Sequence, residues 1–219
     1  MLKRKNDKRK LKGNTMGSRG LYGFIKDGVE KATYNHGDSY PSYLGRDVID
    51  FIKKTTDTGL IDIFDRIVLV NGDTKPSADE LRSLFNSGQY DGAQSGNSWN
   101  DVIRSSRKNF GLYKKAAEKG CPIYMTDDKE FIYNSFYCEY VYFINLDTMR
   151  LEFWLGWQTK QPYKGNRYGE ALNRGPRFAS YPCRPAVEYP LALVRTVPTD
   201  DLVGIMNSLH AAEEQYRRI

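Results

Sequence analysis

The chain has 219 residues, of which 40% are hydrophobic and 27% charged, and its formal net charge is +6. This length fits one domain of ordinary size, and no stretch approaches the roughly 18 consecutive apolar residues of a membrane span, so we expect no membrane partner. The three cysteines, Cys121, Cys138 and Cys183, lack CxxC spacing, which argues against a disulfide framework or a zinc cage and predicts reduced thiols. No secretory signal is recognisable, so a cytoplasmic location is the default expectation.

The net charge is concentrated at the N-terminus. Residues 2–13 hold seven Lys or Arg residues and one Asp, so this stretch carries the whole +6 and the remainder sums to zero. A like-charge run of this kind, with no apolar partner to pack against, is expected to be disordered, which predicts a detachable tail at 1–15 and a single domain at 16–219. The tail either contacts nucleic acid through its charge or is an extension upstream of a second start at Met16.

The first predicted elements are a β-hairpin and a helix. Residues 20–25 form a short apolar strand, Asp27-Gly28 is the signal of a tight turn, and the return strand covers 29–34. After a polar loop, apolar residues recur at helical spacing at Leu44, Val48, Phe51 and Ile52. The period of residues 60–70 fits either a helix or a strand.

Two further helices are predicted in the middle of the chain. Ser77 and Glu80 have the spacing of a capping box, and Gly88 is a typical helix end. The predicted buried stripe of this helix consists of Leu81, Leu84 and Phe85. A second helical segment is expected from the cap at Ser98 to a stop at Gly120.

The second half begins as β-structure. Residues 136–144 are apolar or aromatic at almost every position, which predicts a central strand buried on both faces. Residues 150–157 alternate and form its antiparallel partner. We then expect a long loop over 160–190, a last strand over 191–197 and a C-terminal helix capped by Thr199. These elements predict an α+β fold, an antiparallel sheet with packed helices.

The densest polar cluster lies between Tyr34 and Tyr40, after a strand and before a helix. His36 could act as an acid/base group with Asp38 as the carboxylate that orients it. The alternative is an Asx-rich turn whose side chains bond to local backbone. Glu139, on the expected central strand, is either a buried general acid or the partner of an arginine.

Three segments carry a resemblance to a known family: residues 16–24 (MGSRGLYGF), residues 34–41 (YNHGDSYP), and residues 138–147 (CEYVYFINLD) with the Leu151-Glu152 that follows. They resemble small, functionally uncharacterised proteins from bacteriophages and bacteria. The opening hairpin is in turn similar to N-terminal-nucleophile hydrolases such as the glutamine amidotransferase domain. This resemblance implies a hydrolase-like fold in which Arg19 and the Asn71-Gly72 turn line the site. In these enzymes the first residue, a Cys, Ser or Thr, is the nucleophile. If Met16 were the start and were removed, the first residue here would be Gly17, which has no side chain to act as a nucleophile.

Residues 160–184 alternate cations with aromatic rings, a pattern suited to the phosphates and bases of a nucleotide or a single strand. The alternative is a solvated loop whose rings attach it to the domain. Trp154 and Trp157, expected to be exposed, would extend the surface. The candidate binding residues are Lys164, Arg167, Tyr168, Arg174, Arg177, Trp154 and Trp157.

Common catalytic motifs are missing from the sequence: there is no Walker loop, no HExxH and no GxSxG. No cofactor and no metal site is predicted. The sequence favours a phage-type or bacterial binding or inhibitor protein, with a host-interaction or anti-defence role. It would engage a host protein or a nucleotide-like or nucleic-acid partner through the basic-aromatic loop. The alternative is an N-terminal-nucleophile-like amidohydrolase or its inactive relic.

Overall fold

The computed structural model describes residues 17–90, 97–104, 106–159, 165–169 and 181–217. The predicted tail at 1–15 lies outside these residues. The described strands are β1 (Gly20–Lys26), β2 (Val29–Asn35), β3 (Ile67–Val70), β4 (Ile123–Thr126), β5 (Tyr140–Asn145), β6 (Arg150–Leu155) and β7 (Arg184–Pro190). The described helices are η1 (Pro41–Gly45), α1 (Arg46–Lys53), α2 (Asp57–Arg66), α3 (Ala78–Ser87), α4 (Trp99–Val102), α5 (Phe110–Glu118), η2 (Lys129–Tyr133), α6 (Leu191–Thr196) and α7 (Thr199–Arg217).

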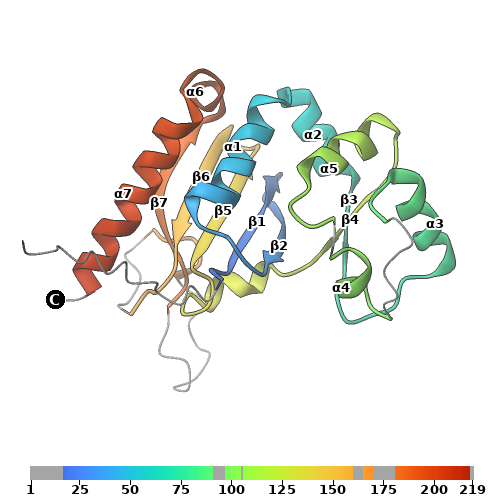
Figure 1. Cartoon of the computed structure of the whole chain (residues 1–219), viewed down its shortest axis with the longest axis horizontal. Coiled ribbons are helices and arrows are strands. Elements are labelled where there is room, and N and C mark those ends of the chain that lie inside the picture. Colours follow the sequence, from blue (N-terminus) through green and yellow to red (C-terminus); the bar gives the residue numbers. More distant parts are fainter. Residues whose placement is uncertain (1–16, 91–96, 105, 160–164, 170–180, 218–219) are drawn as a thin grey trace, which may run out of the picture.

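The α+β class is confirmed. One sheet has five strands in the order β2-β1-β5-β6-β7, and β3 and β4 form a separate parallel pair (Figure 1). The larger sheet is mostly antiparallel, but β1 and β5 run parallel, with Gly20 opposite Tyr140. This pair differs from the expected all-antiparallel sheet because more than a hundred residues, including β3 and β4, separate the two strands along the chain.

The five-stranded sheet is covered on both faces. On one face, Tyr22, Tyr142 and Phe153 pack in a core shared with apolar residues of α1 and α7, which Figure 1 shows lying along the sheet. On the other face, Phe143 and Trp154 pack with residues of η2 and with the buried Cys138. Burial of each such large side chain contributes roughly 1.5–3 kcal/mol, so the sheet is the rigid base of the molecule.

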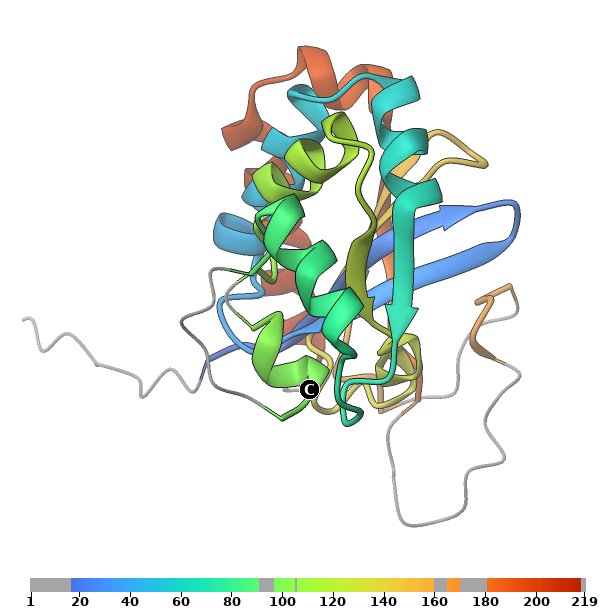
Figure 2. The ribbon, with the colours of Figure 1, turned by 90° about the vertical axis from the view of Figure 1, so that its right-hand side faces the viewer.

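The smaller β3–β4 pair lies beside the outer strand of the sheet, as the view turned by 90° also shows (Figure 2). The hydroxyls of Thr33 in β2 and Thr126 in β4 are 2.7 Å apart, and the backbone nitrogen of Asp128 donates to the carbonyl of Ala32 at 2.9 Å. These bonds hold the β3–β4 part of the molecule, with α3 to α5, next to β2.

The predicted hairpin is confirmed. Asp27 and Gly28 both have positive φ, 53° and 70°, as a two-residue turn between twisted strands requires. The carboxylate of Asp147 accepts hydrogen bonds from both of their backbone N–H groups, at 2.6 and 3.0 Å. These two bonds lower the pKa of Asp147, and they join this turn to the turn between β5 and β6.

The capped helix α3 is also confirmed. Ser77 and Glu80 form the reciprocal capping box, and Gly88 ends the helix in the left-handed conformation with φ 81°. Of the predicted stripe, Leu84 is fully buried, whereas Phe85 is 63% exposed. The expectation for Phe85 was therefore wrong, because the stripe that α3 turns inward is narrower than the one predicted.

Several element boundaries differ from the predictions. Residues 60–70 contain both of the expected alternatives, the end of α2 followed by β3. The segment predicted as one helix from Ser98 to Gly120 is broken into α4 and α5, because Lys108 between them has a left-handed φ of 52°. This break is the most consequential difference, since it forms one side of the cleft described below.

The C-terminal part differs too. Residues 184–190, expected to be loop, form the edge strand β7, and residues 191–196, expected to be a strand, form the helix α6. The C-terminal helix begins at Thr199 as predicted, but the Thr199 hydroxyl bonds to the carboxylate of Asp50 at 2.9 Å. Apolar runs this short do not distinguish strand from helix by themselves.

The expected strand at 136–144 begins only at Tyr140. Phe136 and Tyr137 lie in the preceding turn and are 49% and 45% exposed. Gly156 follows the last residue of β6 and packs closely against the backbone of Cys138. A Cβ at this position would lie 1.9 Å from the carbonyl oxygen of Cys138. Trp157 follows with a φ of 56° and is half-buried, whereas Trp154 is only 3% exposed, so the expected exposure of Trp154 was wrong.

All three cysteines are free thiols, as predicted. Burial raises the pKa of Cys138 well above its usual value, so this thiol is held in its protonated form. Among the described residues, no helix combines the length and the apolar character needed to cross a membrane.

Candidate ligand-binding cleft

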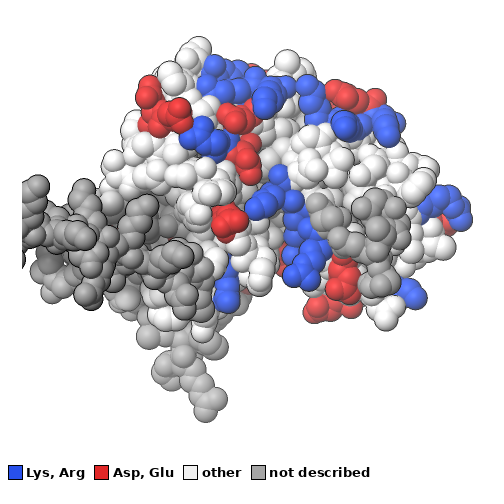
Figure 3. Space-filling model, viewed as in Figure 1, with Lys and Arg blue, Asp and Glu red and all other residues white. Residues whose placement is uncertain are grey.

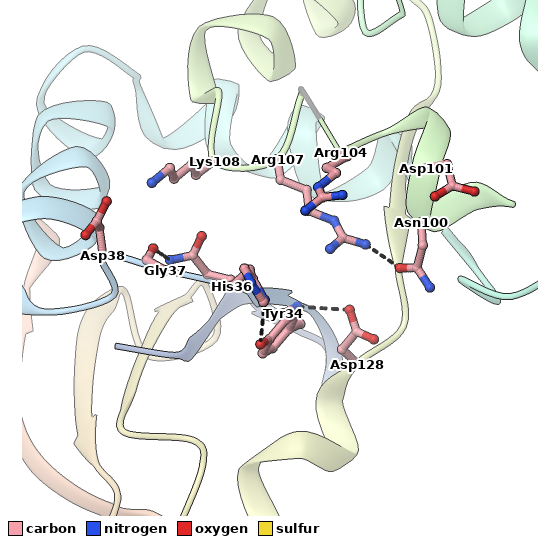
Figure 4. A pocket seen from close by; sticks show the side chains of 11 residues that line it. Tyr34, His36, Gly37, Asp38, Asn100, Asp101, Arg104, Arg107, Lys108 and Asp128 are labelled. Carbon is pink, nitrogen blue, oxygen red and sulfur yellow. Dashed lines mark hydrogen bonds between the residues drawn. The ribbon is translucent and has the colours of Figure 1, made fainter. Parts of the chain in front are cut away.

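A cleft of about 550 Å³ opens between the loop that follows β2 and the segment that joins α4 to α5 (Figure 4). Its polar lining comes from three places in the chain that are far apart in sequence. The lining residues are Tyr34, Asn35, His36, Gly37, Asp38, Asn100, Asp101, Arg104, Arg107, Lys108 and Asp128.

One wall is the loop after β2, which its own side chains hold in place. The side-chain amide of the buried Asn35 donates to the carbonyl of Gly37 at 2.6 Å and to the hydroxyl of Ser39 at 2.8 Å. Asp38 adopts the left-handed conformation with φ 54°, and the backbone nitrogen of Ser39 donates to the Ser18 hydroxyl at 2.9 Å. The predicted Asx-rich turn is therefore present, and it fixes the backbone that carries His36 and Asp38.

The opposite wall carries three cations, Arg104, Arg107 and Lys108. Figure 4 shows the Arg104 and Arg107 side chains extending from this wall, with the Arg107 guanidinium reaching toward Asn100. The segment is fixed from below, because the backbone nitrogen of Lys108 donates to the hydroxyl of the buried Tyr22 at 2.6 Å. A strand of the rigid sheet thus sets the position of the cationic wall.

Arg107 is the most constrained of the three. One of its terminal nitrogens donates to Asn100 Oδ1 at 2.5 Å, and Asn100 is held in turn, since its backbone nitrogen donates to the carbonyl of Gly72 at 2.9 Å. A Cβ at Gly72 would lie 2.5 Å from Asn100 Nδ2, so the close packing requires glycine. The Nε of Arg107 is buried and has no hydrogen-bond partner among the described residues, although an unsatisfied buried donor is costly.

Two of the three acidic residues of the cleft, Asp101 and Asp128, already accept hydrogen bonds from neutral groups. Asp128 Oδ2 accepts from the Tyr34 backbone nitrogen at 2.9 Å and from the Thr126 hydroxyl at 2.6 Å, and Asp101 accepts from the hydroxyl of Ser98 at 2.9 Å. In the part of the chain that the structure describes, neither Arg104, Arg107 nor Lys108 forms an ion pair. The cationic wall can therefore bind an added anion.

His36 and Asp38, predicted from the sequence, both line this cleft. His36 Nδ1 lies 3.2 Å from the Tyr34 hydroxyl, and the described residues show no hydrogen bond between His36 and Asp38. The Asp38 carboxylate and the His36 ring can form hydrogen bonds with a ligand. The two side chains lack the direct contact that orients an acid/base pair.

Arg19 and Asn71, the other two predicted catalytic residues, do not line the cleft. The backbone nitrogen of Arg19 donates to the half-buried Glu139 at 3.2 Å, and its guanidinium lies 5.6 Å from the ring centre of Tyr137. The Asn71 side chain accepts from the backbone nitrogen of Asp73 at 3.0 Å. The Asn71-Gly72 turn contributes indirectly, through the contact of Gly72 with Asn100.

Arg167 and Tyr168, proposed as binding residues, are bonded inside the protein. Arg167 forms a two-pronged ion pair with the carboxylate of Glu152, at 3.0 and 2.8 Å, and its guanidinium lies 4.7 Å from the Trp154 ring centre. The Tyr168 hydroxyl donates to Glu30 at 2.6 Å. Of the two alternatives for the loop, these residues fit the one in which the side chains attach it to the domain.

The remaining candidate binding residues are Lys164, Arg174, Arg177 and Trp157. Lys164, Arg174 and Arg177 lie outside the described residues. Trp157 contacts the exposed Phe136, with ring centres 4.6 Å apart, and is not among the residues that line the cleft.

Two groups of residues were missed by the sequence analysis. The cations at 104, 107 and 108 were read as part of one long helix, and their close spacing just before Asn109 was the only available signal. Glu152 lies on the expected alternating strand at 150–157 and was not singled out as a functional residue, but its side chain is 3% exposed. Its partner Arg167 is fifteen residues away, beyond any local pattern.

No cluster of three or more metal-ligating side chains occurs among the described residues. The sequence matches no protein-family model, and neither a curated protein nor a solved structure matches it.

Proposed function

We propose that this protein binds a small phosphorylated, nucleotide-like ligand in the cleft between His36 and Arg104. One observation carries the proposal. Three cations stand on one wall without an ion-pair partner among the described residues, and the buried Nε of Arg107 has no acceptor. A phosphate would supply acceptor oxygens to these donors, and arginine is well suited to bind phosphate with two parallel hydrogen bonds.

The other wall suits the uncharged part of such a ligand. Asp38 offers a carboxylate for ribose hydroxyls or base N–H groups, and the rings of Tyr34 and His36, with centres 6.0 Å apart, offer flat surfaces. The ligand would therefore carry a phosphate at the cationic wall and hydrogen-bond donors at the Asp38 wall. A nucleotide has both, whereas a simple inorganic anion does not. This proposal keeps the nucleotide-like partner expected from the sequence but assigns it to a different surface.

Isothermal titration of the full chain with adenosine and guanosine diphosphates tests the proposal, with the unphosphorylated nucleosides for comparison. We expect a diphosphate to bind and the nucleosides to bind much more weakly. The double variant Arg104→Ala/Arg107→Ala should lose about a hundredfold or more in affinity, because charged hydrogen bonds contribute roughly 1.5–3 kcal/mol each and the variant removes two charged donors.

The matched control is Arg82→Ala, on the exposed face of α3, where Arg82 pairs with Asp79 at 2.9 Å. This variant should bind as the parent protein does. A diphosphate that does not bind, or that binds the double variant and the parent protein equally, would overturn the proposal.

A further inference from the structure

A second cleft of about 690 Å³ adjoins the first. The two share Arg107 and Lys108, which therefore stand on a ridge with one cleft on either side. Figure 3 shows basic side chains gathered down the middle of this face, with acidic ones beside them. The lining residues of the second cleft are Asp47, Asp50, Phe51, Lys54, Thr55, Arg107, Lys108, Asn109, Phe110, Gly111 and Lys114.

The ridge presents its two shared cations in different directions. Lys108 has the left-handed φ of 52°, and in Figure 4 its side chain turns away from those of Arg104 and Arg107. Its backbone is pinned to Tyr22, so this divergence is a built feature of the wall. Arg107 serves the first cleft, and Lys108 extends the cationic surface toward the second.

The second cleft has the chemistry of a nucleotide subsite. Among its lining residues are the rings of Phe51 and Phe110, which stack with centres 4.8 Å apart and are 6% and 7% exposed, so they give an apolar floor for a base. Lys54 and Lys114 flank it, and Lys114 Nζ donates to the carbonyl of Lys54 at 3.2 Å. Cations for phosphate therefore lie beside an apolar floor in the second cleft.

The acidic residues limit the size of the ligand. The two clefts together are lined by five Lys or Arg residues and five Asp residues, and residues 14–219 have no net charge. A protein binds a long polyanion by neutralising many of its phosphates with Lys and Arg side chains. A surface without excess positive charge therefore contributes little binding free energy for such a ligand. A ligand with few phosphates and several hydrogen-bond donors fits this balance better.

We propose that the two clefts form one groove that binds a dinucleotide. One nucleoside lies in each cleft, and the linking phosphate lies on the ridge of Arg107 and Lys108. This inference rests on the proposed function and specifies its ligand class. It predicts that the second cleft contributes to the binding of two linked nucleotides and contributes nothing to the binding of one that occupies the first cleft.

Titrations of the full chain with adenosine monophosphate, a linear 5′-phosphorylated diadenylate and a longer adenylate single strand test the inference. We expect the dinucleotide to bind at least about tenfold more tightly than the monophosphate, because the second contact becomes intramolecular. The double variant Lys54→Ala/Lys114→Ala should bring the dinucleotide affinity close to that of the monophosphate and leave the monophosphate affinity unchanged. Lys115→Ala, an exposed neighbour on α5 that does not line the cleft, is the matched control and should change neither affinity.

The failure of this inference can be told from the failure of the proposed function. Equal affinities for the two ligands, with no effect of the double variant, would overturn the dinucleotide groove and leave the single-nucleotide site in place. Affinity that keeps rising with strand length would overturn it in favour of a nucleic-acid strand. Absence of binding for all three ligands would overturn both proposals.

Discussion

The hydroxyl of Tyr22, in the middle of the sheet, accepts a hydrogen bond from the backbone nitrogen of Lys108 at 2.6 Å. The same hydroxyl lies 3.0 Å from that of Tyr113 in α5. Because the Tyr22 oxygen accepts from Lys108, its own proton is available to Tyr113. These two bonds join the rigid sheet to the cationic wall of the cleft.

Tyr22→Phe should therefore affect both stability and binding. The substitution leaves the Lys108 N–H without its acceptor, which should lower the free energy of unfolding by about 1–3 kcal/mol and weaken nucleotide binding as the wall loosens. Urea denaturation and the titration described above measure the two effects. Tyr189→Phe is the control: the Tyr189 hydroxyl is buried and has no partner in the described part of the chain, so its removal should be neutral or stabilising. A Tyr22→Phe protein as stable as the parent would contradict the role of this bond.

The ion pair between Glu152 and Arg167 should be a large contributor to stability. Glu152 is 3% exposed and also accepts from Asn145 at 2.7 Å and from the Trp154 indole at 2.9 Å. Arg167→Met leaves this carboxylate buried without its cation, which should cost about 3–5 kcal/mol in denaturant unfolding.

Arg150→Met is the matched control for this pair. Arg150 lies 3.9 Å from Glu188, and both side chains are more than 40% exposed, so the change should be within about 1 kcal/mol. If Arg167→Met proves as mild as Arg150→Met, the Glu152 carboxylate is not held by Arg167 as described. Arg167→Met should leave the nucleotide affinity of the folded protein unchanged, because Arg167 does not line the cleft.

Buried tyrosines should make the protein sensitive to alkali. Burial raises the pKa of Tyr22, and it raises the pKa of Tyr113 and Tyr142 well above the usual value of about 10. Since the folded-state pKa exceeds that of the unfolded chain, their contribution to stability is complete below about pH 10 and is lost as the pH rises toward the folded-state pKa.

The free energy of unfolding, measured from about pH 8 upward, should fall above about pH 10. Tyr142→Phe should reduce the steepness of that fall, because one buried phenol fewer ionises on unfolding. A stability that stays flat up to about pH 11 would show that these phenols do not titrate on unfolding.

Gly72→Ala tests the support behind Arg107. Its Cβ would displace the Asn100 side chain, which accepts from the Arg107 guanidinium, so nucleotide affinity should fall severalfold. Gly204→Ala, in α7 where a Cβ meets nothing within 4 Å, should leave affinity unchanged and raise stability by about 0.5–1 kcal/mol. Unchanged affinity in Gly72→Ala would show that Asn100 does not position Arg107.

Local structure was predictable from the sequence where its cause is local. The Asp27-Gly28 turn follows from residues that tolerate positive φ, and the capping box at Ser77 from two side chains three residues apart. The turn after β2 belongs here as well, since Asn35 bonds within its own loop. Each rests on atoms separated by only a few residues, so the pattern of residue types is enough to specify it.

The tertiary structure alone decided the burial of Glu152, the helical state of residues 191–196 and the identity of the cleft. Glu152 depends on Arg167 and Lys108 depends on Tyr22, which are pairs separated by 15 and 86 residues. The sequence determined that this is an α+β protein with its excess charge at the N-terminus. Only folding decided which cations remain unpaired, because charges far apart in the chain find or miss their partners when the sheet and helices pack.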